Sequence, residues 1–288
     1  MAPPDSDTTS ITELPSATHI GRTALRVASL DAVIPFYRDI VGFDINRNGS
    51  RARLLANDDP LVVLEETPDG TDRPADAAGL FHFAVRVPSR AALGDALERI
   101  RSQDGPLTGA SDHLVSEALY LRDPEGNGVE IYYDTPRDTW TWADDETVDI
   151  DTLPLDLDPI AAEATGADTL PSDTDIGHVH LEVTDLPRAE SFYVDELGFQ
   201  VRSRYGNEAA FLAAGRYHHH IGLNTWNDRR SAAGGGRGLA WFEVVVPDHE
   251  TRDRLQSSLA DQGAVLESDD GALEVTDPDD ITLRLVVE

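Results

Sequence analysis

One carboxylate in the sequence stands where a packed strand is expected. Glu130 lies between Val129 and Ile131, directly after the turn Asp123–Gly128. Burial of a carboxylate among apolar side chains is unfavourable unless a positive partner compensates for it, and a metal ion does so directly. Glu130 is therefore a candidate metal ligand.

Three consecutive histidines form a second stretch that could do chemistry. The run Tyr217–His220 precedes the apolar residues Ile-Gly-Leu. On a strand, His218 and His220 would share one face and His219 would occupy the other. Taken alone, such a run would be an exposed polar edge or a chance cluster of histidines, so its interpretation depends on the motifs around it.

The elements that must position these side chains repeat along the chain. Residues 20–43 recur without a gap as residues 176–199, and residues 80–100 have a weaker counterpart in residues 239–259. Each copy begins with alternating apolar residues, which predicts a strand, and most continue with helical spacing. We expect four related units that begin near residues 20, 80, 176 and 239.

Composition around these units predicts their organisation. Residues 1–17 are rich in Pro, Ser, Thr and Asp, which favours a disordered tail. We expect one domain over residues 18–137 and another over residues 174–288, each of two units. Residues 138–173 read as an acidic linker, with one short helix at 159–164 and with Trp140 and Trp142 packed on a domain surface.

The charge of the chain limits its partners. It has 54 acidic and 23 basic residues, a net charge of −31, and every basic residue is Arg. Such a charge disfavours nucleic acid and anionic membranes as partners. Its even spread suggests adaptation to a high-salt cytoplasm, with an ordinary acidic cytosolic protein as the alternative. The absence of Cys excludes disulfides and thiolate chemistry. Without a long apolar run or a basic-then-apolar N-terminus, we expect a cytoplasmic protein.

Together these patterns resemble the vicinal oxygen chelate superfamily, which contains glyoxalases, bleomycin resistance proteins and extradiol dioxygenases. The resemblance rests on the four units, on SDHLVS at 111–116 followed by Tyr120, on DPEGNGVE at 123–130 and on YHHHIGLNTW at 217–226. The two-domain catechol 2,3-dioxygenases are especially similar. The resemblance implies an α+β fold in which four βαβββ units form two open barrels of mixed β-sheet.

A metal site is also implied by the resemblance. The superfamily's ligand positions on the four opening strands are occupied, in order, by Arg22, His82, His178 and Trp241. The closing-strand carboxylate is Glu130 in the second unit, and Leu283 or a neighbour takes its place in the fourth. His82, His178 and Glu130 remain, a two-histidine, one-carboxylate set typical of non-haem Fe(II), with Mn(II) also possible.

These three ligands converge only if the second and third units share a barrel, which we expect. If the units instead pair in sequence order, His178 lies in the other domain, and Glu65 could complete a different site with His82 and Glu130.

By resemblance, four further residues belong to the active site. His220 is the first candidate for the acid/base catalyst and His219 the second. His113 and Tyr120 match residues near the bound diol, although His113 could be an ordinary loop residue and Tyr120 an ordinary core residue.

The implied activity is extradiol cleavage of a catechol-type ring with O₂. A glyoxalase-like lyase or isomerase, a non-catalytic binding protein and a dioxygenase acting on a hydroquinone are the alternatives. The expected partners are a small aromatic diol and O₂, and a homodimer is possible.

Overall fold

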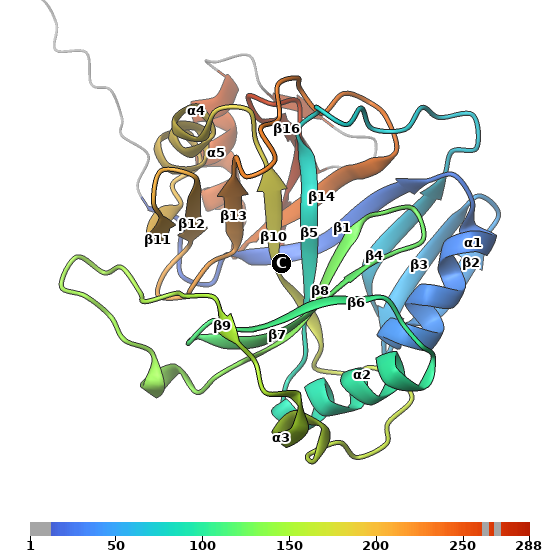
Figure 1. Ribbon diagram of the computed structural model, residues 1–288. Helices are drawn as coiled ribbons and strands as arrows, with labels where there is room; N and C mark the ends of the chain where they lie inside the picture. Colours follow the sequence, from blue (N-terminus) through green and yellow to red (C-terminus); the bar gives the residue numbers. More distant parts are fainter. Residues whose placement is uncertain (1–12, 261–264, 268–271) are drawn as a thin grey trace, which may run out of the picture.

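The computed structural model describes residues 13–260, 265–267 and 272–288 (Figure 1). Most of the predicted disordered tail, residues 1–12, lies outside the described residues. Its remainder packs on the protein: Leu14 is buried, and its backbone N–H donates to the Gly198 carbonyl at 3.0 Å. Within the described residues, no helix is both long and apolar enough to cross a membrane.

All four predicted units have the order of one strand, one helical segment and three strands. The first comprises β1 (His19–Val27), α1 (Leu30–Pro35) with a π-helical turn (Phe36–Val41), β2 (Asp44–Asn48), β3 (Arg51–Ala56) and β4 (Asp59–Glu66). The second comprises β5 (Gly79–Arg86), α2 (Arg90–Ser102), β6 (Leu107–Asp112), β7 (Ser116–Arg122) and β8 (Gly128–Asp134). The third comprises β10 (Asp175–Glu182), α4 (Leu186–Ser191) with a π-helical turn (Phe192–Glu196), β11 (Gln200–Tyr205), β12 (Ala209–Ala213) and β13 (Ile221–Asn224). The fourth comprises β14 (Gly238–Val246), α5 (His249–Ala260), β15 (Val265–Glu267), β16 (Leu273–Thr276) and β17 (Thr282–Val287).

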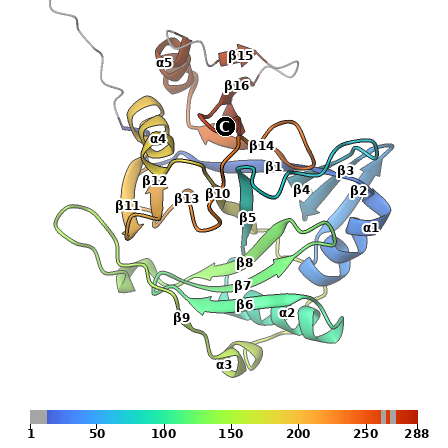
Figure 2. The same ribbon diagram turned by 45° about the horizontal axis from the view of Figure 1, so that its top comes forward.

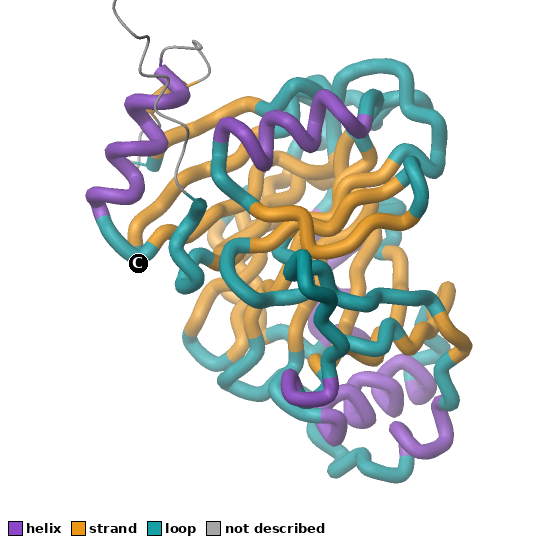
Figure 3. The backbone as a smooth tube through the Cα atoms, turned by 90° about the vertical axis from the view of Figure 1, so that its left-hand side faces the viewer, coloured by secondary structure: helices purple, strands orange, loops and turns teal. Residues whose placement is uncertain are grey.

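The units pair across the two halves of the sequence. One sheet has the strand order β15-β16-β17-β14-β1-β4-β3-β2 and so joins the fourth unit to the first. The other has the order β11-β12-β13-β10-β5-β8-β7-β6-β9 and joins the third unit to the second (Figure 2). The helices lie on the outside of the strands (Figure 3). The predicted α+β fold and the pairing of the second and third units are confirmed, whereas the boundaries of the two predicted domains stay a prediction.

A buried hydrogen bond holds the helix of one unit to the closing turn of the next, once in each half. The Tyr37 hydroxyl donates to Asp123 at 2.9 Å, and the Tyr193 hydroxyl donates to Asp277 at 3.0 Å. Both tyrosine side chains are fully buried. The repeated Phe-Tyr motifs at 36–37 and 192–193 are therefore part of the core, and the repeated Asp-Pro turns supply the acceptors.

The predicted linker is part of the fold. It contains a 3₁₀ turn (Arg137–Thr139), β9 (Leu153–Pro154) and α3 (Leu157–Ala161). β9 pairs with β6, and α3, which contains the fully buried Ile160, packs against α2. Trp140 packs on Tyr217 with ring centroids 6.0 Å apart, as expected for a residue on a domain surface. The helix begins two residues before the predicted one.

Candidate metal centre and active site

The three predicted metal ligands lie on adjacent strands at the centre of one sheet. His178 of β10 is opposite Ala84 of β5, and Glu130 of β8 is opposite the same alanine from the other side. His82 precedes Ala84 by two residues and therefore shares its face. The small side chain between two ligands leaves room for all three to approach one point.

The ligand atoms converge in a buried position. His82 Nε2 is 2.8 Å and His178 Nε2 is 3.2 Å from the same oxygen, Glu130 Oε2. One ligand atom of each residue lies within 4.8 Å of the others, and each of the three residues is no more than 5% exposed.

The arrangement of His82, His178 and Glu130 is better explained by binding of a cation than by hydrogen bonds among the three side chains. Despite its short distance to Glu130, His82 Nε2 has no hydrogen bond of acceptable geometry among the described residues. Burial lowers the pKa of His178 to about 4, although the Glu130 charge opposes this shift. A neutral imidazole keeps a lone pair for a metal, so the residues present fit a divalent ion.

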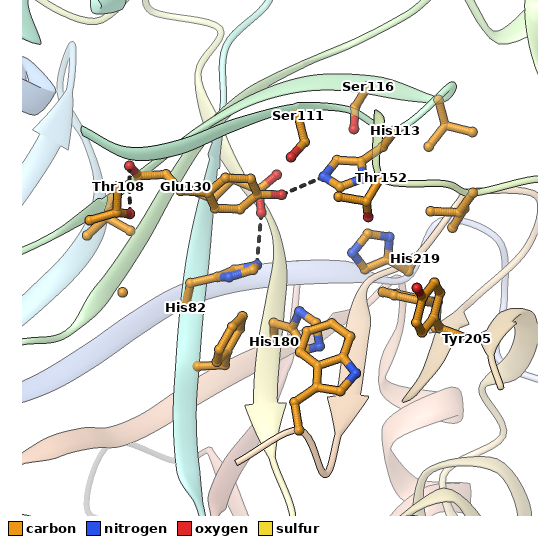
Figure 4. A pocket seen from close by; sticks show the side chains of 18 of the residues that line it. His82, Thr108, Ser111, His113, Ser116, Glu130, Thr152, His180, Tyr205 and His219 are labelled. Atoms are coloured by element: carbon orange, nitrogen blue, oxygen red, sulfur yellow. Dashed lines mark hydrogen bonds and ion pairs between the residues drawn. The ribbon is translucent and has the colours of Figure 1, made fainter. Parts of the chain in front are cut away.

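A cavity of about 430 Å³ opens beside these ligands and is lined by His82 and Glu130 (Figure 4). Tyr120 and His113, both predicted site residues, also line it. Tyr120 is opposite Glu130 across β7 and β8.

A hydrogen-bond pair fixes the proton positions on His113 and Tyr120. His113 Nδ1 lies 2.6 Å from the Asp151 carbonyl oxygen, and Nε2 lies 2.5 Å from the Tyr120 hydroxyl. A carbonyl only accepts, so His113 donates from Nδ1, and its Nε2 can accept the proton of the Tyr120 hydroxyl. Burial and the neighbouring Glu130 charge raise the pKa of Tyr120, so its hydroxyl keeps the proton and its oxygen retains a lone pair.

The histidine run does not form the predicted strand. Residues 217–220 are a bend, and β13 begins only at Ile221. His219 lines the cavity, with its ring centroid 4.1 Å from that of His178. His220 lies outside the cavity lining, where its Nδ1 accepts the Ala214 backbone N–H at 3.2 Å. The structure thus favours His219, the second candidate, over His220, because His219 is the one of the two that lines the cavity.

Behind His219 lies a chain of polar contacts that sequence reasoning missed. His218 Nδ1 is 2.7 Å from His219 Nδ1, and His218 Nε2 is 2.8 Å from Asp134 Oδ1. Although burial opposes its ionisation, the His218 imidazole and the Arg86 guanidinium hold the pKa of Asp134 below its usual value. An ionised Asp134 only accepts, so His218 donates to it from Nε2, and His218 Nδ1 can accept the proton on His219 Nδ1. Nε2 of His219 is then free to act as a base.

A sequence-family model described as the Glyoxalase/Bleomycin resistance protein/Dioxygenase superfamily matches residues 19–131 and 175–284. The chain belongs to this superfamily.

Relatives within the superfamily are similar to this chain over different lengths. A protein named catechol-2,3-dioxygenase from Bacillus subtilis (strain 168) is 39% identical over 276 residues, which are 93% of this chain and 96% of that protein. A biphenyl-2,3-diol 1,2-dioxygenase 3 from Rhodococcus globerulus is 29% identical over 148 residues, 49% of this chain and 78% of that protein. The expected resemblance to catechol dioxygenases is confirmed.

A solved structure shares the fold. Glyoxalase I from Zea mays superposes with a TM-score of 0.59 at 18% identity, over 94% of this chain and 92% of that one.

The sheet formed by the first and fourth units carries other side chains at the superfamily's ligand positions. In this sheet Arg284 lies opposite Glu243, just as Glu130 lies opposite Ala84 in the other sheet. The carboxylate position is therefore taken by Arg284, the neighbour of Leu283. Arg22 makes an ion pair of 2.5 Å with Glu243. The Arg284 guanidinium lies 4.1 Å from the ring of Trp241. Cations at two of the three positions explain why the described residues of this sheet contain no equivalent group of metal ligands.

Proposed function

We propose that this protein is an extradiol dioxygenase that uses non-haem Fe(II) and O₂ to open a catechol-type ring beside its two hydroxyls. The observation that carries the proposal is the buried convergence of His82, His178 and Glu130 beside a cavity. Two neutral imidazoles and one carboxylate suit Fe(II), and Mn(II) suits similar ligands. Similarity over 93% of the chain to a protein named catechol-2,3-dioxygenase supports the same activity.

In this proposal the three ligands hold the ion and the other residues of the cavity handle protons. Fe(II), when bound, supplies the Lewis acidity and redox chemistry that joining a diol to O₂ requires. His219 accepts a hydroxyl proton of the diol at Nε2, because its Nδ1 proton is donated to His218. Tyr120 accepts a hydrogen bond from the other hydroxyl, because its own proton is donated to His113.

The alternatives receive less support from the site. A glyoxalase-like lyase or isomerase would use two histidines and two carboxylates, whereas the group of candidate ligands in the described residues contains one carboxylate, Glu130. A binding protein without turnover would need neither the free His219 nitrogen nor the Asp134–His218 pair behind it. We therefore favour the dioxygenase.

Oxygen uptake tests the proposal. Protein reconstituted anaerobically with Fe(II) in high salt should consume O₂ when catechol is added and form a yellow, ring-opened semialdehyde. Glu130→Ala and His178→Ala should abolish both signals, whereas His220→Asn, a substitution outside the cavity, should retain them. Iron-loaded protein that consumes no O₂ with any simple catechol would contradict the proposal.

A further inference from the structure

A second cavity, of about 380 Å³, shares no lining residue with the cavity at the metal ligands. Three arginines from different parts of the chain line it, Arg26, Arg73 and Arg237. The lining contains one carboxylate, that of the exposed Asp280. The chain as a whole has 54 acidic residues and 23 arginines, so a cavity with more arginines than carboxylates is the reverse of its composition.

Arg26 is the arginine of this cavity whose charge is not compensated. It is partly buried on β1, and its guanidinium makes no hydrogen bond or ion pair within the described residues. On one side it is opposite Gly238 of β14, which has no side chain to cover it. On the other side it is opposite Glu65 of β4, whose Oε1 lies 2.7 Å from Arg51 Nη2. Partial loss of hydration without a partner is unfavourable for a guanidinium, so this position favours an anion from solution.

The equivalent position of the other sheet carries the opposite charge. In the gap-free repeat of the sequence, Arg26 of the first unit corresponds to Glu182 of the third. Each of the two is opposite the glycine that begins the neighbouring strand. The buried Glu182 lies 2.6 Å from the Arg73 guanidinium and 2.7 Å from that of Arg229. The third unit therefore supplies its own anion at this place, whereas the first unit supplies a cation.

The other two arginines reach the cavity from connections that lie side by side. Residues 67–78 join β4 to β5 and carry Arg73, and residues 225–237 join β13 to β14 and end at Arg237 (Figure 1). The backbone N–H of Arg237 donates to the Thr71 carbonyl at 2.8 Å. These contacts hold guanidinium groups from both halves of the chain at one cavity.

Donor groups of both connections remain available to an anion. Arg73 uses two of the five N–H groups of its guanidinium in hydrogen bonds, and Arg237 pairs with the exposed Asp72. Gly234 and Gly235 also line the cavity, and no described residue accepts their backbone N–H groups. Successive backbone N–H groups in a turn can bind an anion together with arginine side chains.

We propose that this cavity is a second binding site, which takes a phosphate group on Arg26, Arg73 and Arg237. A phosphate group carries a charge of about −1.5 to −2 at pH 7 and presents three strong acceptor oxygens, which suits guanidinium groups from three segments. A carboxylate brings one charge and two oxygens. The volume lies in the range of about 300–1,000 Å³ for small-molecule sites, so the phosphate may belong to a larger molecule.

Isothermal titration calorimetry of the full chain tests the site with inorganic phosphate, ribose 5-phosphate and acetate. About one phosphate should bind per chain, and acetate should bind at least about tenfold more weakly because it makes fewer charge-assisted hydrogen bonds. Ribose 5-phosphate that binds more tightly than phosphate would assign the rest of the cavity to an organic group, and equal affinities would assign the site to the free ion. His178→Ala should still bind phosphate, because the candidate metal site takes no part.

Substitution of Arg26 decides whether the cavity holds the anion. Arg26→Gln should weaken phosphate binding by at least about tenfold, because a hydrogen bond to a charged group is lost. Arg101→Gln is the matched control: it removes the same charge from an exposed arginine of α2 outside the cavity, and should change the affinity by less than about twofold. Gly235→Asp adds a carboxylate to the lining at a position with open space, and should also weaken binding by at least about tenfold.

The outcomes are independent of the proposed dioxygenase function. No phosphate binding by the wild type, or equal losses in Arg26→Gln and Arg101→Gln, would overturn the inference even if the enzyme cleaves catechol. Phosphate binding that depends on Arg26 would stand even if no catechol is cleaved, because the two cavities have no lining residue in common.

Discussion

Replacement of Asp134 by Asn tests whether the buried chain behind the cavity sets the proton position on His219. Asp134 Oδ1 lies 2.8 Å from His218 Nε2 and accepts the Tyr217 hydroxyl at 3.2 Å. Asn has nearly the same shape but can turn its NH₂ group toward His218 Nε2, which must then accept. His218 then carries its proton on Nδ1, and the proton of His219 moves to Nε2. The free base that faces the diol becomes a donor.

The size of the effect follows from the loss of one general base. Such a base contributes about 10²–10⁴-fold to a rate, so we expect kcat to fall by at least about 10²-fold, or roughly 2.7 kcal/mol of barrier. The diol keeps its contacts with Tyr120 and the cavity wall, so KM should change by less than about threefold. A hydrogen bond to an ionised carboxylate contributes about 1.5–3 kcal/mol, which overlaps this value, so the tautomers of His218 and His219 must be measured beside kcat to separate the two explanations.

Steady-state oxygen uptake measures kcat and KM, and ¹⁵N NMR of the imidazoles reports the tautomers of His218 and His219. Tyr217→Phe is the matched control, because it removes a hydrogen bond to the same Asp134 oxygen without changing the partner of His218. We expect its kcat to stay within about threefold of the wild type, the effect of a weak hydrogen bond. Equal losses in both variants, or an Asp134→Asn enzyme of nearly full activity, would refute the reasoning.

Three further outcomes follow from the structure. Burial raises the pKa of Asp277 from 3.8 to about 6, so the stability that its protonated form contributes is lost as the pH rises through 6. Tyr193→Phe should therefore cost about 1.5–3 kcal/mol at pH 7.5, where Asp277 is ionised, and less at pH 5; equal costs in urea unfolding would contradict this. His219→Asn should lower kcat by about 10²-fold, whereas His220→Asn should leave it nearly unchanged, and similar losses would return the acid/base role to His220. Gly177→Ala places a Cβ 1.7 Å from the Tyr132 hydroxyl and should lower stability in thermal unfolding by about 1–3 kcal/mol, whereas Gly235→Ala, with open space around it, should not.

The repeated motifs made most of the fold predictable from the sequence. The Ile-Gly motif opens two strands because an alanine at Gly21 or Gly177 would collide with the neighbouring strands. The Phe-Tyr motif is repeated because Tyr37 and Tyr193 each reach the aspartate of a closing turn. Such local requirements restrict the residue type at fixed positions, so they can be recognised in the sequence. The pairing of units was predictable for a different reason, because only one pairing brings the three remaining ligand positions together.

Features that depend on contacts distant in sequence could not be predicted in the same way. His218 and Asp134 are 84 residues apart, and no spacing rule connects them. The order of His219 and His220 could not be settled from the sequence, because a period of two residues separates their faces but does not say which face points inward. The predicted linker has a polar composition, yet Trp140, Val148 and Ile160 are buried. A few apolar side chains are enough to pack such a segment on its neighbours.

The stoichiometry of metal binding tests the central claim most directly. After anaerobic incubation with Fe(II) and gel filtration, elemental analysis should find about one iron per wild-type chain, since the described residues contain one suitable donor set. His82→Ala, His178→Ala and Glu130→Ala should each lose most of the iron, whereas His113→Ala and His220→Ala should retain it. A full equivalent of iron in His178→Ala, or none in the wild type, would contradict the account, because the proposed site requires ligands from both halves of the chain.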